Sequence, residues 1–112
     1  MLQDFIQFRD LLQIYHWQTK SYARHVAAGQ LYDKFQINLD RIIEAYTKNN
    51  KRITINTSVK LYNVSDSEME KILEEFVRFL ASLKFPKRSD LENIRDEILS
   101  DVNQTLYLFT FQ

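Results

Sequence analysis

Apolar residues recur at helical spacing in four stretches of the chain, and these stretches predict four helices. The first helix is expected over residues 2–20 and the second over residues 23–48. The third is expected to open at Ser65, and the fourth to follow Pro86. The residues expected to face the core are Leu2, Phe5, Ile6, Leu12 and Tyr15, then Leu31, Phe35, Leu39, Ile42 and Tyr46, then Met69, Ile72, Leu73, Phe76, Leu80 and Leu83, and finally Leu91, Ile94, Ile98, Val102 and Leu106.

Turn residues and capping patterns mark the expected ends of these helices. The sequences SDSE at residues 65–68 and SDLE at residues 89–92 both have the capping-box pattern that opens a helix. Pro86 cannot continue a helix and predicts a short turn before the fourth one. The first boundary has two candidates, because Ser21 is a fair N-cap and Gly29 could follow a helix C-terminus.

Residues 49–63 change from helical spacing to alternation, which predicts an extended segment or short strands. At roughly 3.3 Å per residue, this connection can run the length of a neighbouring helix. The other two connections are short, so each joins an antiparallel helix pair. We therefore expect a single all-α domain over residues 1–112, a four-helix bundle with one long crossover between helices two and three, as in ferritin-like folds.

Composition supports a helical domain and excludes several classes of function. The chain has 112 residues, 45% of them hydrophobic, with one glycine and one proline. The lack of cysteine excludes a disulfide framework and a cysteine nucleophile, and we expect a cytoplasmic location. Fifteen basic residues balance fifteen acidic ones, which argues against nucleic-acid binding. No segment approaches the ~20 apolar residues of a membrane span, and we expect no signal peptide.

The two histidines of the chain and two carboxylates could together bind a metal ion. The candidate ligands are His16, His25, Asp40 and Glu44, and the last two lie one helical turn apart on the same face. Such a mixed nitrogen and oxygen set suits Fe(II), Mn(II) or Zn(II). The structural alternative is that His16 packs beside Trp17 and His25 caps a helix, while the carboxylates pair with neighbouring cations or solvent.

The segment that holds these residues, HWQTKSYARHVAAGQLYDKFQINLDRIIE, resembles the miniferritins, the DNA-protecting proteins of starved bacteria. Those proteins have a His-Trp pair near the end of the first helix, then a second His, then an Asp and a Glu four residues apart. The aromatic-rich end of the chain, residues 106–109, is similar to the tail of that family. The segment also looks like part of a set of short proteins encoded by large DNA viruses and phages.

The resemblance implies an iron site between two subunits related by a twofold axis. His16 and His25 would come from one chain, and Asp40 and Glu44 from its partner, so that Fe(II) is oxidised by peroxide or oxygen near Trp17. A homo-oligomer, at least a twofold dimer, is therefore expected. The chain departs from the family in its closer histidines and in lacking a basic N-terminal tail, so DNA protection is not expected. A metal-free structural or interaction module of the same descent is the alternative.

The end of the chain, LYLFTF at residues 106–111, is apolar around more than one helix face. Packing at the open end of the bundle explains this pattern, and so does a contact between subunits. The sequence leaves both explanations open.

Overall fold

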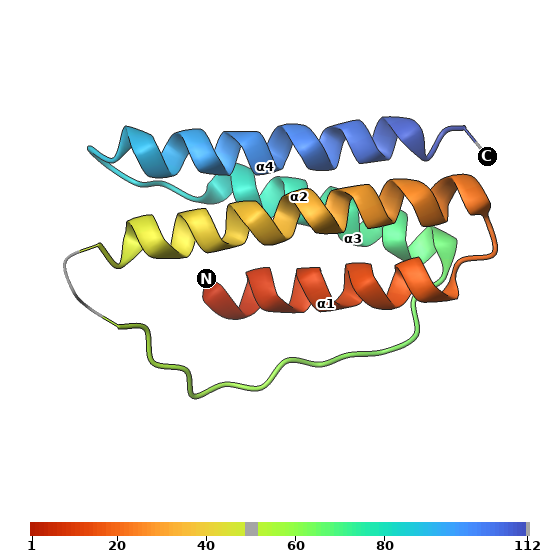
Figure 1. The fold of residues 1–112 in the computed structure, drawn as a ribbon, viewed down its shortest axis with the longest axis horizontal. Helices are drawn as coiled ribbons and strands as arrows, with labels where there is room; N and C mark the ends of the chain where they lie inside the picture. The colour runs from red at the N-terminus through yellow and green to blue at the C-terminus, as the bar shows by residue number, and fades with distance from the viewer. Residues whose placement is uncertain (49–51, 112) are drawn as a thin grey trace.

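Four helices dominate the computed structural model, which describes residues 1–48 and 52–111. They are α1 (Leu2–Gln18), α2 (Tyr22–Tyr46), α3 (Asp66–Ser82) and α4 (Ser89–Leu108). Figure 1 shows α1 and α4 running in one direction and α2 and α3 in the other. Each helix packs against two neighbours, in the order α1, α2, α4, α3 around the bundle. This confirms the predicted all-α four-helix bundle with one long crossover.

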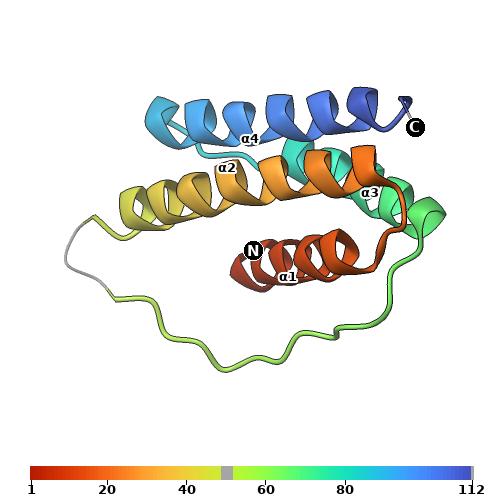
Figure 2. The same ribbon diagram turned by 45° about the vertical axis from the view of Figure 1, so that its right-hand side comes forward.

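The long connection from α2 to α3 crosses from one end of the bundle to the other along the outer side of α1 (Figures 1 and 2). Its described residues 52–65 have no regular secondary structure, so the short strands that the alternation allowed do not form there. The extended path does form, because side chains of α1 hold it: Gln7 Nε2 donates to the Lys60 carbonyl at 3.1 Å, and Gln18 Oε1 accepts from the Val64 amide at 2.8 Å.

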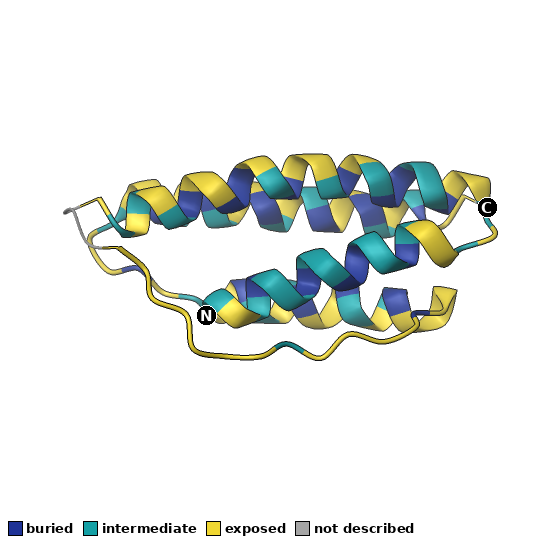
Figure 3. Cartoon of the chain, turned by 60° about the horizontal axis from the view of Figure 1, so that its bottom comes forward, coloured by how far each residue is buried: buried dark blue, intermediate teal, exposed yellow. Residues whose placement is uncertain are grey.

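Phenylalanine rings from three helices fill the middle of the core. Phe8 and Phe76 stack with ring centroids 3.8 Å apart, and Phe35 meets Phe8 edge to face at 5.1 Å. Most of the predicted core positions are buried, as the dark stripes along the inner helix faces in Figure 3 show. Tyr46 is an exception, because it is the last residue of α2 and is exposed. Leu2, Ile6, Ile72, Leu83 and Leu106 are only partly buried.

The two predicted capping boxes have different outcomes. At α3 the box is present, since Ser65 Oγ accepts from the Glu68 amide and the Glu68 carboxylate accepts from the Ser65 amide. At α4 it is wrong: Ser89 is the first helical residue and Arg88 is the N-cap, without a side-chain cap. Arg88 binds Asp90 through two nitrogens, at 3.0 and 2.9 Å. This pairing lowers the pKa of Asp90 to about 2.

Ser21 marks the boundary between α1 and α2, and it is one of the two residues predicted as candidates for this boundary. Its side chain accepts a hydrogen bond from the Arg24 amide at 3.2 Å and so caps the first turn of α2. Gly29 is therefore not a helix end, because it lies inside α2 and has no positive φ.

A β-turn between α3 and α4 holds a lysine in the left-handed region. The Arg88 amide donates to the Phe85 carbonyl at 3.0 Å and closes the turn around Pro86 and Lys87. Lys87 has a φ of 61°, a conformation that costs a residue with a Cβ about 1–2 kcal/mol. The predicted turn at Pro86 is thus present, with strain at the residue that follows.

Replacing this lysine by glycine should stabilise the protein. Lys87→Gly removes the strain and is expected to raise the free energy of unfolding by up to ~1 kcal/mol, measured by urea denaturation with an unchanged slope. The matched control is Lys84→Gly in the same loop, which relieves no strain and should lower stability because glycine adds freedom to the unfolded chain. Equal losses in both variants would contradict the assignment of strain to Lys87.

Candidate functional site

The two histidines lie face to face where α1 turns into α2. The ring centroids of His16 and His25 are 3.9 Å apart, with 14° between the ring planes. The Nδ1 atom of each ring lies 2.7 Å from the backbone carbonyl oxygen of the other residue. Because a carbonyl oxygen only accepts, both Nδ1 atoms carry the proton. We call this reciprocal arrangement of His16 and His25 the histidine clamp.

The histidine clamp also caps a helix end. His16 is in the last turn of α1, where carbonyl groups have no partner within the helix. The His25 ring donates to one of these carbonyls, which is the capping role that the structural alternative predicted. The His16 ring packs against His25, while Trp17 is exposed.

Gly29 makes room for the histidine clamp. A Cβ atom at this position would lie 2.8 Å from Cε1 and 3.2 Å from Nδ1 of His16, too close for either atom to stay in place. Glycine inside a helix costs about 1 kcal/mol relative to alanine. The only glycine of the chain therefore serves the approach of the His16 ring to α2.

The stacked rings are poorly arranged for a shared metal ion. An imidazole binds metal through a lone pair in the plane of its ring, and two nearly parallel planes do not meet close to the rings. An ion midway between the rings would be displaced from each plane by up to half of the 3.9 Å separation. That displacement is nearly the whole length of a metal–nitrogen bond, about 2.0–2.1 Å. A shared ion therefore requires one ring to turn.

The two carboxylates of the predicted site lie at the other end of α2. Asp40 and Glu44 are exposed, and Asp40 follows His25 by fifteen positions of the same helix, which is about 22 Å along the axis. Among the residues with described positions, no three His, Asp or Glu side chains are close enough to bind one ion. A single chain thus does not bring the four residues together, and a site completed by a second copy stays a prediction.

A buried arginine lies close to the histidine clamp. Arg24 is 3% exposed, and its Nη2 donates to Glu70 Oε1 at 2.7 Å and to the Phe109 carbonyl at 3.2 Å. Its guanidinium carbon also lies 4.7 Å from the centroid of the Phe109 ring. Burial lowers the pKa of Arg24, but its interactions with Glu70 and Tyr15 together outweigh this effect and leave the pKa raised. The guanidinium is therefore charged and links α2 to α3 and to the end of α4.

Two other nitrogens of this guanidinium are buried without a partner. Nε and Nη1 of Arg24 find no hydrogen-bond acceptor among the described residues. The side chain borders a hollow of about 370 Å³, which Glu70 and Glu74 also line. Because two carboxylates face the same hollow, it suits water or a neutral carbonyl group better than an anion.

Tyr15 ties α1 to the beginning of α3. Its hydroxyl donates to Asp66 Oδ1 at 2.7 Å, and the Thr19 hydroxyl donates to the same oxygen at 2.9 Å. The hydrogen bond from Tyr15 lowers the pKa of Asp66 below its ordinary value, and burial raises the pKa of Tyr15. Helical spacing marked Tyr15 only as a core residue, because the partner of its hydroxyl is 51 positions away in the chain.

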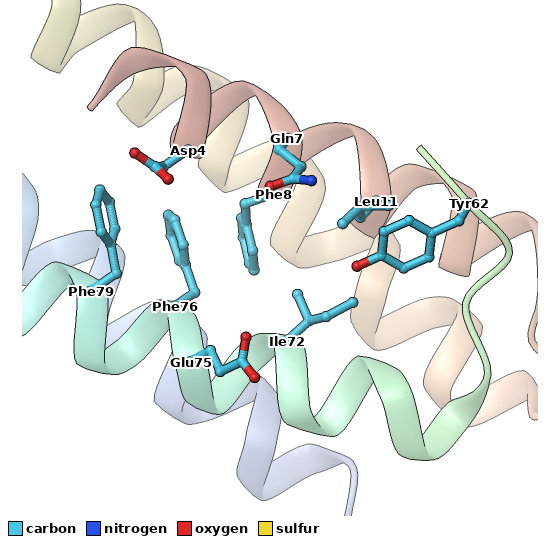
Figure 4. A pocket seen from close by; sticks show the side chains of 9 residues that line it. All are labelled: Asp4, Gln7, Phe8, Leu11, Tyr62, Ile72, Glu75, Phe76 and Phe79. Atoms are coloured by element: carbon cyan, nitrogen blue, oxygen red, sulfur yellow. The ribbon is translucent and has the colours of Figure 1, made fainter. Parts of the chain in front are cut away.

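A groove of about 260 Å³ lies between α1 and α3 (Figure 4). Carboxylates of Asp4 and Glu75 line opposite sides of it, and Tyr62 from the crossover closes one end. Phe8 and Phe76 form its floor. The lining combines these two carboxylates and the Gln7 amide with apolar and aromatic side chains.

These features define a helical-bundle domain with a histidine clamp, and comparison with known proteins places it in a family. Residues 16–109 match the family described as "Family of unknown function (DUF5856)", and the chain belongs to this family. The match begins at His16 and covers the clamp and the Arg24 contacts. No curated protein and no solved structure matches the chain. None of the described helices has the length and apolar character needed to cross a membrane.

Alanine at the glycine position should destabilise the wild type and stabilise a variant without the His16 ring. In Gly29→Ala the new Cβ meets the ring, and we expect a loss of about 1–3 kcal/mol in the free energy of unfolding. In a His16→Ala background the same change should gain about 0.5–1 kcal/mol from helix propensity. Chemical denaturation of the four proteins measures this cycle. The same sign in both backgrounds would rule out the contact as the reason for the glycine.

The Tyr15–Asp66 hydrogen bond should make stability depend on acid pH. The pKa of Asp66 is lowered in the folded state, so its contribution is present above the unfolded pKa of about 3.9 and is lost as pH falls through the folded value. Tyr15→Phe should cost about 0.5–1.5 kcal/mol near pH 6. The difference from wild type should shrink towards pH 2, while the exposed control Tyr22→Phe shows no such trend. A difference independent of pH would contradict the proposed pairing.

Proposed function

We propose that this chain is a helical structural or interaction module that works without a metal ion. The histidine clamp is the observation that supports this proposal most directly. Each Nδ1–H donates to a backbone carbonyl of the other helix, and one face of each ring packs against the other ring. Gly29 adds a sequence feature that is needed for this packing, whether or not metal is present.

Exposed aromatic side chains support a role in interaction. The apolar tail divides into two parts, because Phe109 is buried against Tyr15 and Arg24 while Tyr107 and Phe111 are 62% and 56% exposed. Trp17 and Tyr22 are exposed beside the turn between α1 and α2, at the same end of the bundle as the C-terminal end of α4 (Figure 1). Large exposed aromatic side chains are enriched where proteins contact one another.

A metal-binding oligomer that oxidises Fe(II) is the second candidate. Its support is that Nε2 of neither histidine has a hydrogen-bond partner in the described part of the chain, while Nδ1 is bonded as in many metal-bound histidines. Asp40 and Glu44 are also exposed and available to a second copy. This candidate requires two chains and a rotated ring.

Two substitutions of one histidine separate these functions. Asparagine places an amide N–H near the position of Nδ1, whereas glutamine places its polar end nearer to Nε2. If the clamp is structural, His25→Asn should retain more stability than His25→Gln in thermal unfolding of the metal-free protein. Neither variant should change Fe(II) oxidation, followed by ferric absorbance after oxygen or peroxide is added.

A metal function predicts instead that the protein binds metal and that variants of the ligands lose this binding. It requires Fe(II), Mn(II) or Zn(II) to bind stoichiometrically in calorimetric titrations, with binding lost in His25→Asn and in Asp40→Asn. Asp33→Asn serves as the control, since Asp33 is an exposed carboxylate of α2 outside the predicted set. Such a result would refute the metal-free role and favour the second candidate.

A further inference from the structure

Residues 53–61 of the crossover form an extended, exposed segment at the edge of the molecule, which we call the crossover strand (Figures 1 and 3). Ile53, Ile55 and Leu61 in it are 41%, 55% and 48% exposed. Its amide and carbonyl groups make no hydrogen bond to the backbone of any other described residue. An extended segment with exposed apolar side chains, and with backbone groups that have no backbone partner, is an edge to which another strand can add.

Hydrogen bonds join the crossover to α1, and the two that involve the crossover backbone indicate which backbone edge is open. A side chain of the crossover strand also bonds α1: Thr57 Oγ1 donates to Gln3 Oε1 at 2.7 Å. The Lys60 carbonyl and, just beyond the strand, the Val64 amide both bond to glutamines of α1, so even-numbered backbone groups face that helix. Successive residues of an extended chain direct their backbone groups to opposite edges. In a regular extended chain the backbone groups of residues 53, 55, 57, 59 and 61 therefore lie on the edge that α1 does not bind, while the Thr57 side chain reaches α1.

The side chains of the crossover strand are arranged symmetrically about Thr57. In an antiparallel pair with Thr57 opposite Thr57, Ile53 lies opposite Leu61 and Ile55 opposite Val59. The polar residues between them also lie opposite polar residues, and no two like charges meet. Cross-strand pairs of β-branched and apolar side chains stabilise such a ladder, and a slip by one residue would lose them.

We propose that the crossover strand pairs antiparallel with the same strand of a second copy of this chain, with Thr57 on the twofold axis. The inference rests on the interaction role proposed above and names the partner as the chain itself. The same surface is used by both copies, so the contact closes as a dimer. A ribbon of two strands is only weakly stable by itself. The dimer should therefore dissociate on dilution.

Introduced cysteines test the register, because the chain has none of its own. In Thr57→Cys the two opposing Cα atoms would be about 4.5–5.5 Å apart, within the 4.4–6.8 Å range of disulfides. In the neighbouring control Ser58→Cys the two thiols would lie on a diagonal of about 7–8 Å. Mild oxidation should crosslink Thr57→Cys at least tenfold faster than Ser58→Cys. Equal rates, or no crosslink in Thr57→Cys, would overturn the register.

Paired proline substitutions test the open edge. Thr57→Pro removes an amide from the open edge together with the hydroxyl that bonds Gln3, and Ser58→Pro removes an amide from the edge that α1 binds. Thr57→Val loses only the hydroxyl and should dimerise like the wild type. Sedimentation equilibrium in EDTA should show a concentration-dependent wild-type dimer, with a dissociation constant at least tenfold higher in Thr57→Pro and within threefold in Ser58→Pro. Circular dichroism should show an intact bundle in both. A wild type that remains monomeric, or a dimer equally tolerant of both prolines, would overturn the inference.

Adding Fe(II) separates the failure of this inference from the failure of the proposed function. A protein that stays monomeric in EDTA and with metal would overturn the strand pairing alone, and the metal-free role would stand. A dimer that forms only with Fe(II) and is lost in His25→Asn would overturn both.

Discussion

The buried guanidinium of Arg24 constrains the end of the bundle where all four helices meet. A buried charge is strongly destabilising unless an opposite charge and hydrogen bonds compensate for it. Glu70 of α3 and the Phe109 carbonyl beyond α4 supply that compensation, and the Phe109 ring that lies near the guanidinium also contacts Tyr15 of α1. The ends of α3 and α4 can therefore move away from α2 only by leaving a charge unpaired, which fixes how the two helix pairs meet.

The histidine clamp adds a second constraint at the same end. Stacking and two reciprocal hydrogen bonds join the last turn of α1 to the first turn of α2, and the absence of a side chain at Gly29 lets the rings approach. The clamp and the Tyr15–Asp66 bond together connect α1 to two other helices through polar contacts. The polar contacts that join α1 to α2 and α3 therefore lie at the end of the bundle where the histidines are.

The sequence predicted the four helices well and the contacts between them less well. Helical spacing identified the four helices and most of the core, because period and burial are local properties of each stretch. The two capping boxes show the limit: Ser65 and Ser89 have the same pattern, but Arg88 pairs with Asp90 and the helix begins one residue earlier than predicted. Nothing local indicates that His16 faces Gly29 or that Tyr15 bonds Asp66, since each contact depends on how helices meet.

The direction in which the crossover runs connects the proposed dimer with the predicted metal ligands. Within one chain the crossover begins at the end of α2 near Glu44 and finishes at the end of the bundle where His16 and His25 lie. Antiparallel pairing of two crossover strands would therefore set the histidine end of one bundle beside the carboxylate end of the other. An inter-subunit metal site requires the same arrangement, because it combines the histidines of one chain with the carboxylates of the other. A dimer by itself thus favours neither function, and the choice depends on whether the histidine rings remain stacked in it.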